Sequence, residues 1–190
     1  KILFKIYLHY FQRLMRYVKK LGMIYISTPF SKLAVDRLVK FKVPAFKIGS
    51  GECNNYPLIE YIAKKKKPII LSTGMNTIKT IKPAVQIFRK FKVPYALLHC
   101  TNIYPTPTNQ VRLDALDKLK SFFPDAVLGL SDHSTTIYPC LGAIAKGASI
   151  VEKHFTDNKK RKGPDISASM DTFELKELLK GSKEIFLAKG

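Results

Sequence analysis

The feature that most constrains the fold is a strict alternation of short apolar segments with amphipathic helical ones. Six β-rich runs begin 21 to 31 residues apart along the chain. They cover residues 24–27, 45–48, 68–71, 95–99, 126–130 and 149–152. Continuous apolar strands separated by helices are typical of a parallel sheet, because each helix returns the chain to the start of the next strand. The sequence therefore predicts an α/β fold.

Helical periodicity fills the intervals between these runs. The predicted helices cover residues 34–41, 58–65, 81–91, 113–122, 138–146 and 172–187. A further amphipathic helix precedes Gly22, which stands where a helix C-cap is expected. The last helix opens with Asp171 and Glu174 at capping-box spacing, which marks its first turn.

The strand ends decide between two sheet architectures. Each run leads into hydroxyl, amide or ionisable side chains, among them Thr28, Lys47, Ser72, Asn102 and His133. A barrel builds its site from many strand ends, whereas a doubly wound open sheet concentrates chemistry at one switch point. We therefore expect a (β/α)8 TIM barrel, with the open sheet as the alternative. The chain has 190 residues, short of the roughly 250 of a typical barrel, so about six of eight strands are expected.

Composition narrows the class of partner. The chain carries 33 Lys and Arg against 14 Asp and Glu, a formal net charge of +19. Lysines are scattered over helix ends and loops without a recognised nucleic-acid module, so we expect a solvated basic surface and no nucleic-acid partner. Basic residues interrupt the first 21 residues, which argues against a membrane span there. Three widely separated cysteines do not suggest a disulfide framework, which favours the cytoplasm.

A candidate anion site centres on Lys47. Lys47 ends its apolar run and is followed by Ser50 between two glycines and then by Glu52. Glycines let the backbone approach a ligand closely, so a phosphate or carboxylate site is the functional interpretation. The alternative is a lysine whose ammonium simply reaches water. Ser72 and Ser131 add hydroxyls at two further strand ends.

Two histidines form a candidate metal site. His133 and His154 follow successive runs, with Asp132 and Glu152 beside them. Imidazoles with nearby carboxylates suit a divalent transition metal such as Mn²⁺, Fe²⁺ or Zn²⁺. The alternative for either histidine is a hydrogen-bonded structural residue. We expect that structural role for His99, which lies inside an apolar run.

Asp165 lies on the longest loop after the last run, behind a Gly-Pro pair and the basic residues 159–162. Such a loop can bring an acid over a site as a lid. Asp after Gly-Pro is also ordinary turn chemistry, and this interpretation stays open.

Seven segments together resemble the N-acetylneuraminate (sialic acid) synthase family, which includes the closely similar legionaminic acid synthases. They are STPFS at 27–31, FKIGSGECNN at 46–55, LSTGM at 71–75, HCTNIYP at 99–105, GLSDH at 129–133, EKHF at 152–155 and GPD at 163–165. The resemblance runs from about Gly22 onward in the family's order. It implies a transferase that condenses phosphoenolpyruvate with N-acetylmannosamine or a related N-acylated hexosamine, releasing phosphate and forming a nine-carbon 2-keto sugar acid.

The resemblance also implies roles for individual residues. Phosphoenolpyruvate would be held by Thr28, Lys47, Ser50, Ser72, Asn102 and Ser131. His133 and His154 would bind a divalent metal, expected to be Mn²⁺, with Mg²⁺ or Co²⁺ as alternatives. Glu52, Tyr104 and Asp165 would contact the open-chain sugar, with the two acids as catalytic residues for proton transfer.

The family architecture implies parts beyond this match. Two βα units precede the matched region in the family, and a C-terminal antifreeze-like domain supplies an arginine to a dimer partner. We therefore expect residues 1–190 to be a partial TIM-barrel catalytic domain with open edges at residues 24–27 and 149–152. The complete protein is expected to be a homodimer, and this part alone to have little activity.

Two other functions remain as alternatives. One is a Schiff-base aldolase with Lys47 as its nucleophile. The other is a truncated barrel that binds anions without turnover. The acceptor also stays open among N-acetylmannosamine, its phosphate and a legionaminic acid precursor, although residues 53–55 look less like the pseudaminic acid branch.

Overall fold

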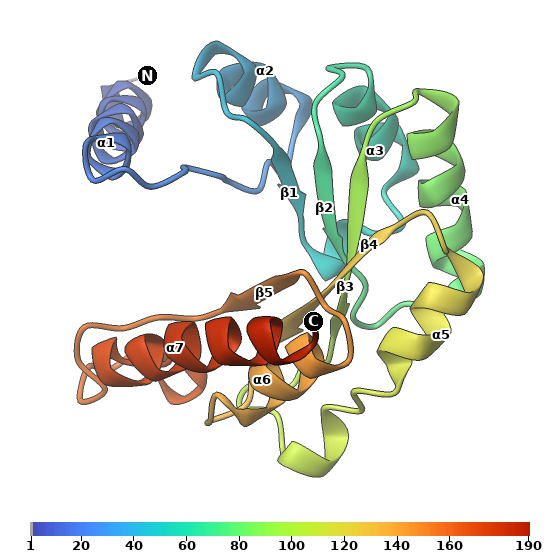
Figure 1. The fold of residues 1–190 in the computed structure, drawn as a ribbon. Helices are drawn as coiled ribbons and strands as arrows, with labels where there is room; N and C mark the ends of the chain where they lie inside the picture. The colour runs from blue at the N-terminus through green and yellow to red at the C-terminus, as the bar shows by residue number, and fades with distance from the viewer. Residues whose placement is uncertain (1) are drawn as a thin grey trace.

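The computed structural model describes residues 2–190, with side chains from Tyr10 onward, and shows an α/β fold on one parallel sheet (Figure 1). Its strands are β1 (Phe46–Ile48), β2 (Ile69–Ser72), β3 (Tyr95–Cys100), β4 (Val127–Asp132) and β5 (Ile150–Lys153). They lie side by side in chain order, and the sheet curls into a half-barrel. A doubly wound sheet would reverse its strand order. The barrel-type fold is therefore confirmed over the open sheet.

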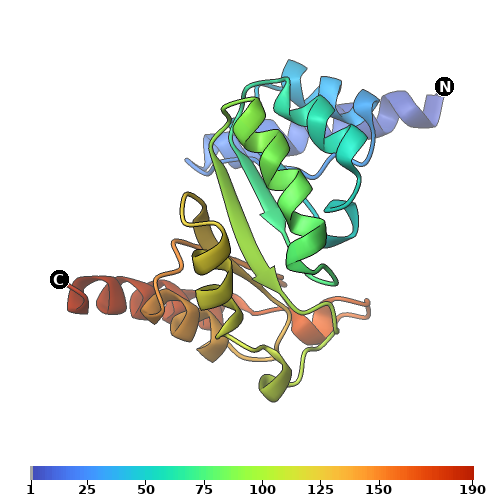
Figure 2. The ribbon, with the colours of Figure 1, turned by 90° about the vertical axis from the view of Figure 1, so that its right-hand side faces the viewer.

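Helices connect the strands and cover the outer face of the sheet (Figure 2). They are α1 (Ile2–Lys20), α2 (Lys32–Lys40), α3 (Tyr56–Ala63), α4 (Ile78–Lys90), α5 (Ala115–Phe122), α6 (Tyr138–Ala145) and α7 (Thr172–Ala188). Short 3₁₀ helices η1 (Ser50–Glu52), η2 (Thr108–Gln110) and η3 (Ile166–Ala168) follow β1, β3 and β5. From residue 10 to the end of the described chain, no helix is both long and apolar enough to cross a membrane.

The predicted helix ends are also found. Gly22 adopts a positive φ of 74° just after α1, and the Met23 amide donates to the Val18 carbonyl at 3.1 Å. Asp171 and Glu174 form a reciprocal capping box at the start of α7, each side chain accepting the other's backbone amide. Both devices satisfy backbone groups that a helix end leaves without intrahelical partners.

The main core lies between the outer face of the sheet and helices α2 to α4. Phe46 and Leu97 project from the strands and are fully buried, as are Ile59 and Phe88 on the helices. Burying each such side chain contributes roughly 1.5–3 kcal/mol. This packing fixes the positions of β1, β2 and β3, whose C-terminal ends carry the candidate site.

The predicted strand at residues 24–27 is not formed, so the structure has five strands here and not six. The segment is an irregular link from α1 to α2, with Ile24 72% exposed. A β-rich sequence becomes a strand only when another strand satisfies its backbone groups, and β1 pairs only with β2 among the described residues. The open edges are therefore β1 and β5.

Candidate functional site

One face of the sheet carries most of the predicted anion-binding residues. Side chains alternate between the two faces of a strand, and the parallel register aligns Cys100 with Ser131 and Ser131 with Glu152. The same alternation brings Lys47 and Ser72 onto this inner face. The C-terminal end of the half-barrel thus has a polar inner lining.

Lys47 is the centre of that lining. Its Nζ donates to Ser72 Oγ at 2.8 Å and lies 3.4 Å from Glu152 Oε2, while Ser131 Oγ donates to Glu152 Oε1 at 3.0 Å. Lys47 is only 9% exposed, so its ammonium does not simply reach water. Lys47 lies on β1 and Glu152 on β5, so this network joins the two edge strands across the inside of the half-barrel.

Ser50 and Asn102 extend the lining around Gly74. The Gly74 amide donates to Ser50 Oγ at 3.0 Å, and Cys100 Sγ donates to Asn102 Oδ1 at 3.0 Å. A Cβ at position 74 would lie 1.9 Å from Asn102 Oδ1. Glycine is therefore required here if the Asn102 amide is to keep its place beside the β2 strand end.

His133 is held in one orientation by two hydrogen bonds. The Thr101 carbonyl can only accept, so the proton of the bond to His133 Nδ1 at 3.0 Å belongs to the imidazole. Nε2 then accepts from the Tyr104 hydroxyl at 2.8 Å, and the two rings stack with centroids 4.0 Å apart. Burial lowers the pKa of His133 below its usual range, and the neighbouring His154 adds to this. Burial and the Thr101 hydrogen bond together favour the neutral ring with its lone pair on Nε2.

The two histidines meet beside the Glu152 carboxylate. The His133 and His154 ring centroids are 5.4 Å apart. His133 and His154 line a cavity of about 160 Å³ together with Ser131, Asp132, Glu152 and Lys153. Two imidazoles are a donor set that suits a divalent transition metal, and the Thr101 hydrogen bond is the kind of outer contact that orients a metal-binding histidine. Within the described side chains, no group of three or more His, Cys, Asp or Glu is arranged to hold a metal.

Two of the three residues expected to contact the sugar, Tyr104 and Asp165, lie beside this centre. Tyr104 is close to both histidine rings. Asp165 begins η3 on the loop after β5, with its carboxylate 3.9 Å from His154 Nδ1 and half exposed. Glu52, in η1 after β1, accepts from the Asn55 side chain at 2.6 Å. All three are on loops at the C-terminal end of the sheet.

Two residues named from the sequence make no hydrogen bond to their expected neighbours in the described part of the chain, and the role of Thr28 stays a prediction. Thr28 lies on the link between α1 and α2 and has no hydrogen bond to the Lys47 network in the described part of the chain. Alternation turns the Asp132 side chain to the opposite face of β4, where it pairs with Lys153, although both residues also line the small cavity beside the histidines. His99 has the expected structural role: it is buried and its Nε2 lies 2.7 Å from the Val111 carbonyl.

Sequence reasoning gave too little weight to Glu152 and Cys100. Glu152 was considered only as a neighbour of His154, yet it contacts both Lys47 and Ser131. Cys100 shares the inner face and lies 3.9 Å from His133 Nδ1. The sequence signal for both is their position at the end of an apolar run, but the register that makes them neighbours of Ser131 on one face comes from the structure.

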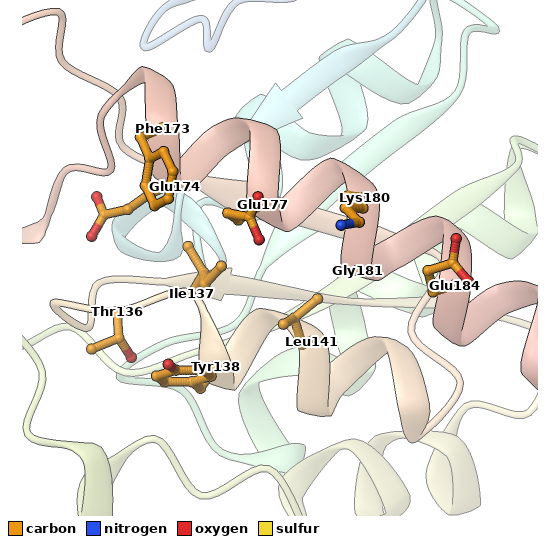
Figure 3. Close-up of a pocket in the computed structure, with 10 residues that line it drawn as sticks. All are labelled: Thr136, Ile137, Tyr138, Leu141, Phe173, Glu174, Glu177, Lys180, Gly181 and Glu184. Atoms are coloured by element: carbon orange, nitrogen blue, oxygen red, sulfur yellow. The ribbon is translucent and has the colours of Figure 1, made fainter.

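A larger cavity of about 550 Å³ lies elsewhere, between α6 and α7 (Figure 3). It is lined by apolar side chains such as Leu141 and Phe173 and by glutamates of α7, including Glu177 and Glu184. None of the predicted site residues contributes to it. The chemistry-bearing side chains are concentrated at the strand ends instead.

Comparison with known proteins places the chain in a family. A sequence model of the NeuB family matches residues 4–190. N,N'-diacetyllegionaminic acid synthase of Campylobacter jejuni is 42% identical over 182 residues, which cover 94% of this chain and 54% of that protein. Human N-acetylneuraminate-9-phosphate synthase is 36% identical over 180 residues, covering 95% of this chain and 50% of that protein. The chain thus spans about half the length of these curated relatives.

A solved structure agrees with the sequence relatives. The N-acetylneuraminic acid (sialic acid) synthetase from Leptospira borgpetersenii, crystallised in complex with citrate, superposes with a TM-score of 0.93 at 34% identity. The match covers 96% of this chain and 64% of that one. The resemblance drawn from the seven sequence segments is therefore confirmed, and the chain belongs to the NeuB family.

Proposed function

We propose that the protein is a transferase that condenses phosphoenolpyruvate with an N-acylated hexosamine and water to give a sialic acid-type 2-keto sugar acid and phosphate. The observation that carries this proposal is the network Lys47–Ser72 and Lys47–Glu152–Ser131 beside the His133–His154 pair. It joins a buried cation and several hydroxyls to an adjacent pair of imidazoles. A substrate with a phosphate, a carboxylate and a reacting carbon needs both parts.

The Lys47 end suits phosphoenolpyruvate. Its ammonium, the Ser72 and Ser131 hydroxyls and the Asn102 amide would bind the phosphate and carboxylate oxygens. Charge-assisted hydrogen bonds of this kind are short and strong, and they stabilise negative charge on a leaving phosphate. A Schiff-base lysine instead has to lose its proton in an apolar or cationic setting. The facing Glu152 carboxylate makes the setting of Lys47 anionic, which argues against the Schiff-base role.

The histidine end suits the aldehyde of the acceptor. His133 and His154 would hold a divalent ion, with Mn²⁺ expected and Mg²⁺ or Co²⁺ as alternatives. When bound, such an ion would supply Lewis-acid polarisation of the aldehyde oxygen. The Tyr104 hydroxyl, which lies on His133 Nε2, would turn to contact the sugar.

The reaction balances with the acids available here. Carbon 3 of phosphoenolpyruvate bonds to the aldehyde carbon, whose oxygen takes a proton and becomes a hydroxyl. Water adds its oxygen to carbon 2 and loses a first proton, which leaves a hydroxyl there. The carbon 2–oxygen bond to phosphate then breaks, the 2-keto group forms, and the hydroxyl's proton leaves with the phosphate. Glu52 and Asp165 would move these protons, since both lie on loops at the strand ends.

The family further suggests a cytoplasmic homodimer with further units on both sides of this region. The acceptor is proposed as N-acetylmannosamine, its phosphate or a legionaminic acid precursor. The test uses the full chain, that is, the complete protein with the flanking units proposed above. It is incubated with phosphoenolpyruvate, Mn²⁺ and each acceptor in turn, and phosphate release and 2-keto acid formation are measured. Phosphate release that requires one acceptor and Mn²⁺ supports the proposal.

Two other results of that test would overturn it. Absence of phosphate release with every acceptor, while phosphoenolpyruvate still binds, would favour a barrel that binds anions without turnover. Covalent trapping of a keto substrate on Lys47 by borohydride would favour a Schiff-base aldolase.

A further inference from the structure

A buried ion pair lies behind the histidines, on the opposite face of the same strands. Lys153 Nζ is 2.6 Å from Asp132 Oδ2, and both side chains are 1% exposed. Asp132 and Lys153 are aligned as the last paired residues of β4 and β5. Each is followed directly in the chain by one of the two histidines.

Every polar group of this pair has a partner. Asp132 also accepts from the amide and hydroxyl of Ser134 and from Cys140 Sγ. Lys153 donates to the Ser134 carbonyl at 2.7 Å as well as to Asp132. From the neighbouring strand β5, Lys153 therefore binds both residues that flank His133 in the chain, Asp132 and Ser134.

The pair is located at an edge of the sheet. Strand β5 is only four residues long and pairs with β4 alone among the described strands. The backbone bond from the Met170 amide to the His154 carbonyl gives a second restraint just beyond it. On the inner face, the Ser131–Glu152 hydrogen bond links the preceding aligned residues. Side chains thus join β4 to β5 on both faces of the sheet, at the last paired residues before His133 and His154.

Stability alone is a weak reason for such a pair. Taking two charges out of water is costly, and replacing a buried ion pair with well-packed apolar residues is often neutral or stabilising. A directional network, however, fixes relative positions in a way that apolar packing does not.

We propose that Lys153, through Asp132 and the Ser134 carbonyl, is a positioning residue that sets the separation of His133 and His154. The proposal rests on the proposed function in that the two histidines are taken as the metal pair. It adds a residue whose side chain is 1% exposed and bonds to Asp132 and Ser134, so that it acts on the histidines through the end of the β4–β5 ladder.

The experiment compares the full chain with the double variant Asp132→Leu/Lys153→Met, which removes both charges together. Mn²⁺ affinity is measured by electron paramagnetic resonance without substrates, kcat/KM by phosphate release, Tm by calorimetry and the ring separation by crystallography. We expect roughly a 10- to 100-fold loss of Mn²⁺ affinity, the range for residues that orient metal-binding histidines. Tm should change little, and the rings should move from their 5.4 Å separation.

The matched control is Lys146→Met. Lys146 also bridges two acceptors, Asp114 and Asp117, but at the surface of α6. It should leave Mn²⁺ affinity unchanged. If the double variant does not fold, Asp132→Asn decides, because it weakens the network while keeping its shape, and a smaller loss of affinity is expected.

The proposal is overturned if the folded double variant keeps both its Mn²⁺ affinity and its ring separation. If only Asp132→Asn folds, unchanged Mn²⁺ affinity in that variant overturns it. The proposed function has its own test, because it fails if the unmodified chain releases no phosphate with any acceptor. If the unmodified chain does not bind Mn²⁺, the ring separation alone decides whether Lys153 positions the histidines.

Discussion

The two faces of the same five strands differ in what their side chains do. The outer face carries Phe46, Leu71 and Leu97, which are fully buried under the helices. The inner face carries Lys47 and Ser131 at its C-terminal end, where they join the polar network. The difference shows that side chains in a continuous apolar run still alternate between two faces with different roles. One set of alternate positions builds the core, while the other changes from apolar to polar only at the strand end.

The comparison is tested first on the outer face, where the largest effect is expected. Phe88 of α4 is fully buried and packs against Tyr95 with ring centroids 5.3 Å apart. Phe88→Ala should lower the free energy of unfolding by about 3–5 kcal/mol, through lost burial and the cavity left behind. Urea unfolding followed by circular dichroism measures this. Substrate affinity of the folded fraction should be unchanged, and a loss below about 1 kcal/mol would show that this face packs loosely.

Lys47→Met makes the opposite test on the inner face. We expect kcat/KM to fall by roughly 10²–10³-fold, the usual cost of removing one donor from a site that stabilises developing charge. The free energy of unfolding should change little, because methionine fills the same space and Glu152 keeps its Ser131 partner. Steady-state kinetics with phosphoenolpyruvate varied and urea unfolding measure the two quantities. Equal losses of stability and activity would mean that Lys47 is a structural residue.

Gly74→Ala tests how closely the inner lining is fitted. The added methyl would meet Asn102 Oδ1 at 1.9 Å and Ser50 Oγ at 3.0 Å. The Asn102 amide has to move, so we expect a higher KM for phosphoenolpyruvate and a stability loss of about 1–3 kcal/mol, typical of overpacking. The control is Gly51→Ala, because a Cβ at position 51 meets nothing within 4 Å. Equal KM values for the two variants would contradict the close fit.

Much of the fold could be predicted because it depends on local patterns. The helices and the five strands lie within three residues of their predicted bounds, since amphipathic period and strand length are written in the sequence. Residues 24–27 have the same β-rich composition but no ladder partner, and composition does not report whether a partner exists. Strand formation is a pairwise property, which a single segment does not reveal.

The candidate site was predicted as a set of residues but not as a geometry. Lys47 and Ser72 were expected at one pocket, and they are hydrogen-bonded to each other. Asp132 was assigned to the histidines because it precedes His133, yet adjacent residues on a strand face opposite sides. Its partner Lys153 is on another strand. Such contacts depend on the register of β4 against β5, which the spacing of motifs does not give.

The smallest expected effect concerns His99, the one described histidine on the outer face of the sheet. Burial lowers the pKa of His99 below its usual range, and its Nε2 is hydrogen-bonded to the Val111 carbonyl. The unfolded chain therefore binds a proton at this residue more readily than the folded one. The stability that His99 contributes is fully present above its unfolded pKa, near 6.5, and is lost as the pH falls toward its folded pKa.

His99→Gln keeps an N–H donor for Val111 but does not titrate. We expect the free energy of unfolding to fall less for His99→Gln than for the unmodified chain between about pH 7.5 and about pH 5.5, with part of the fall remaining because His133 is shifted in the same direction. Urea unfolding at a series of pH values measures both slopes. Identical slopes would mean that His99 takes up its proton equally in the folded and unfolded chain. Water would then reach the outer face more readily than its packing indicates.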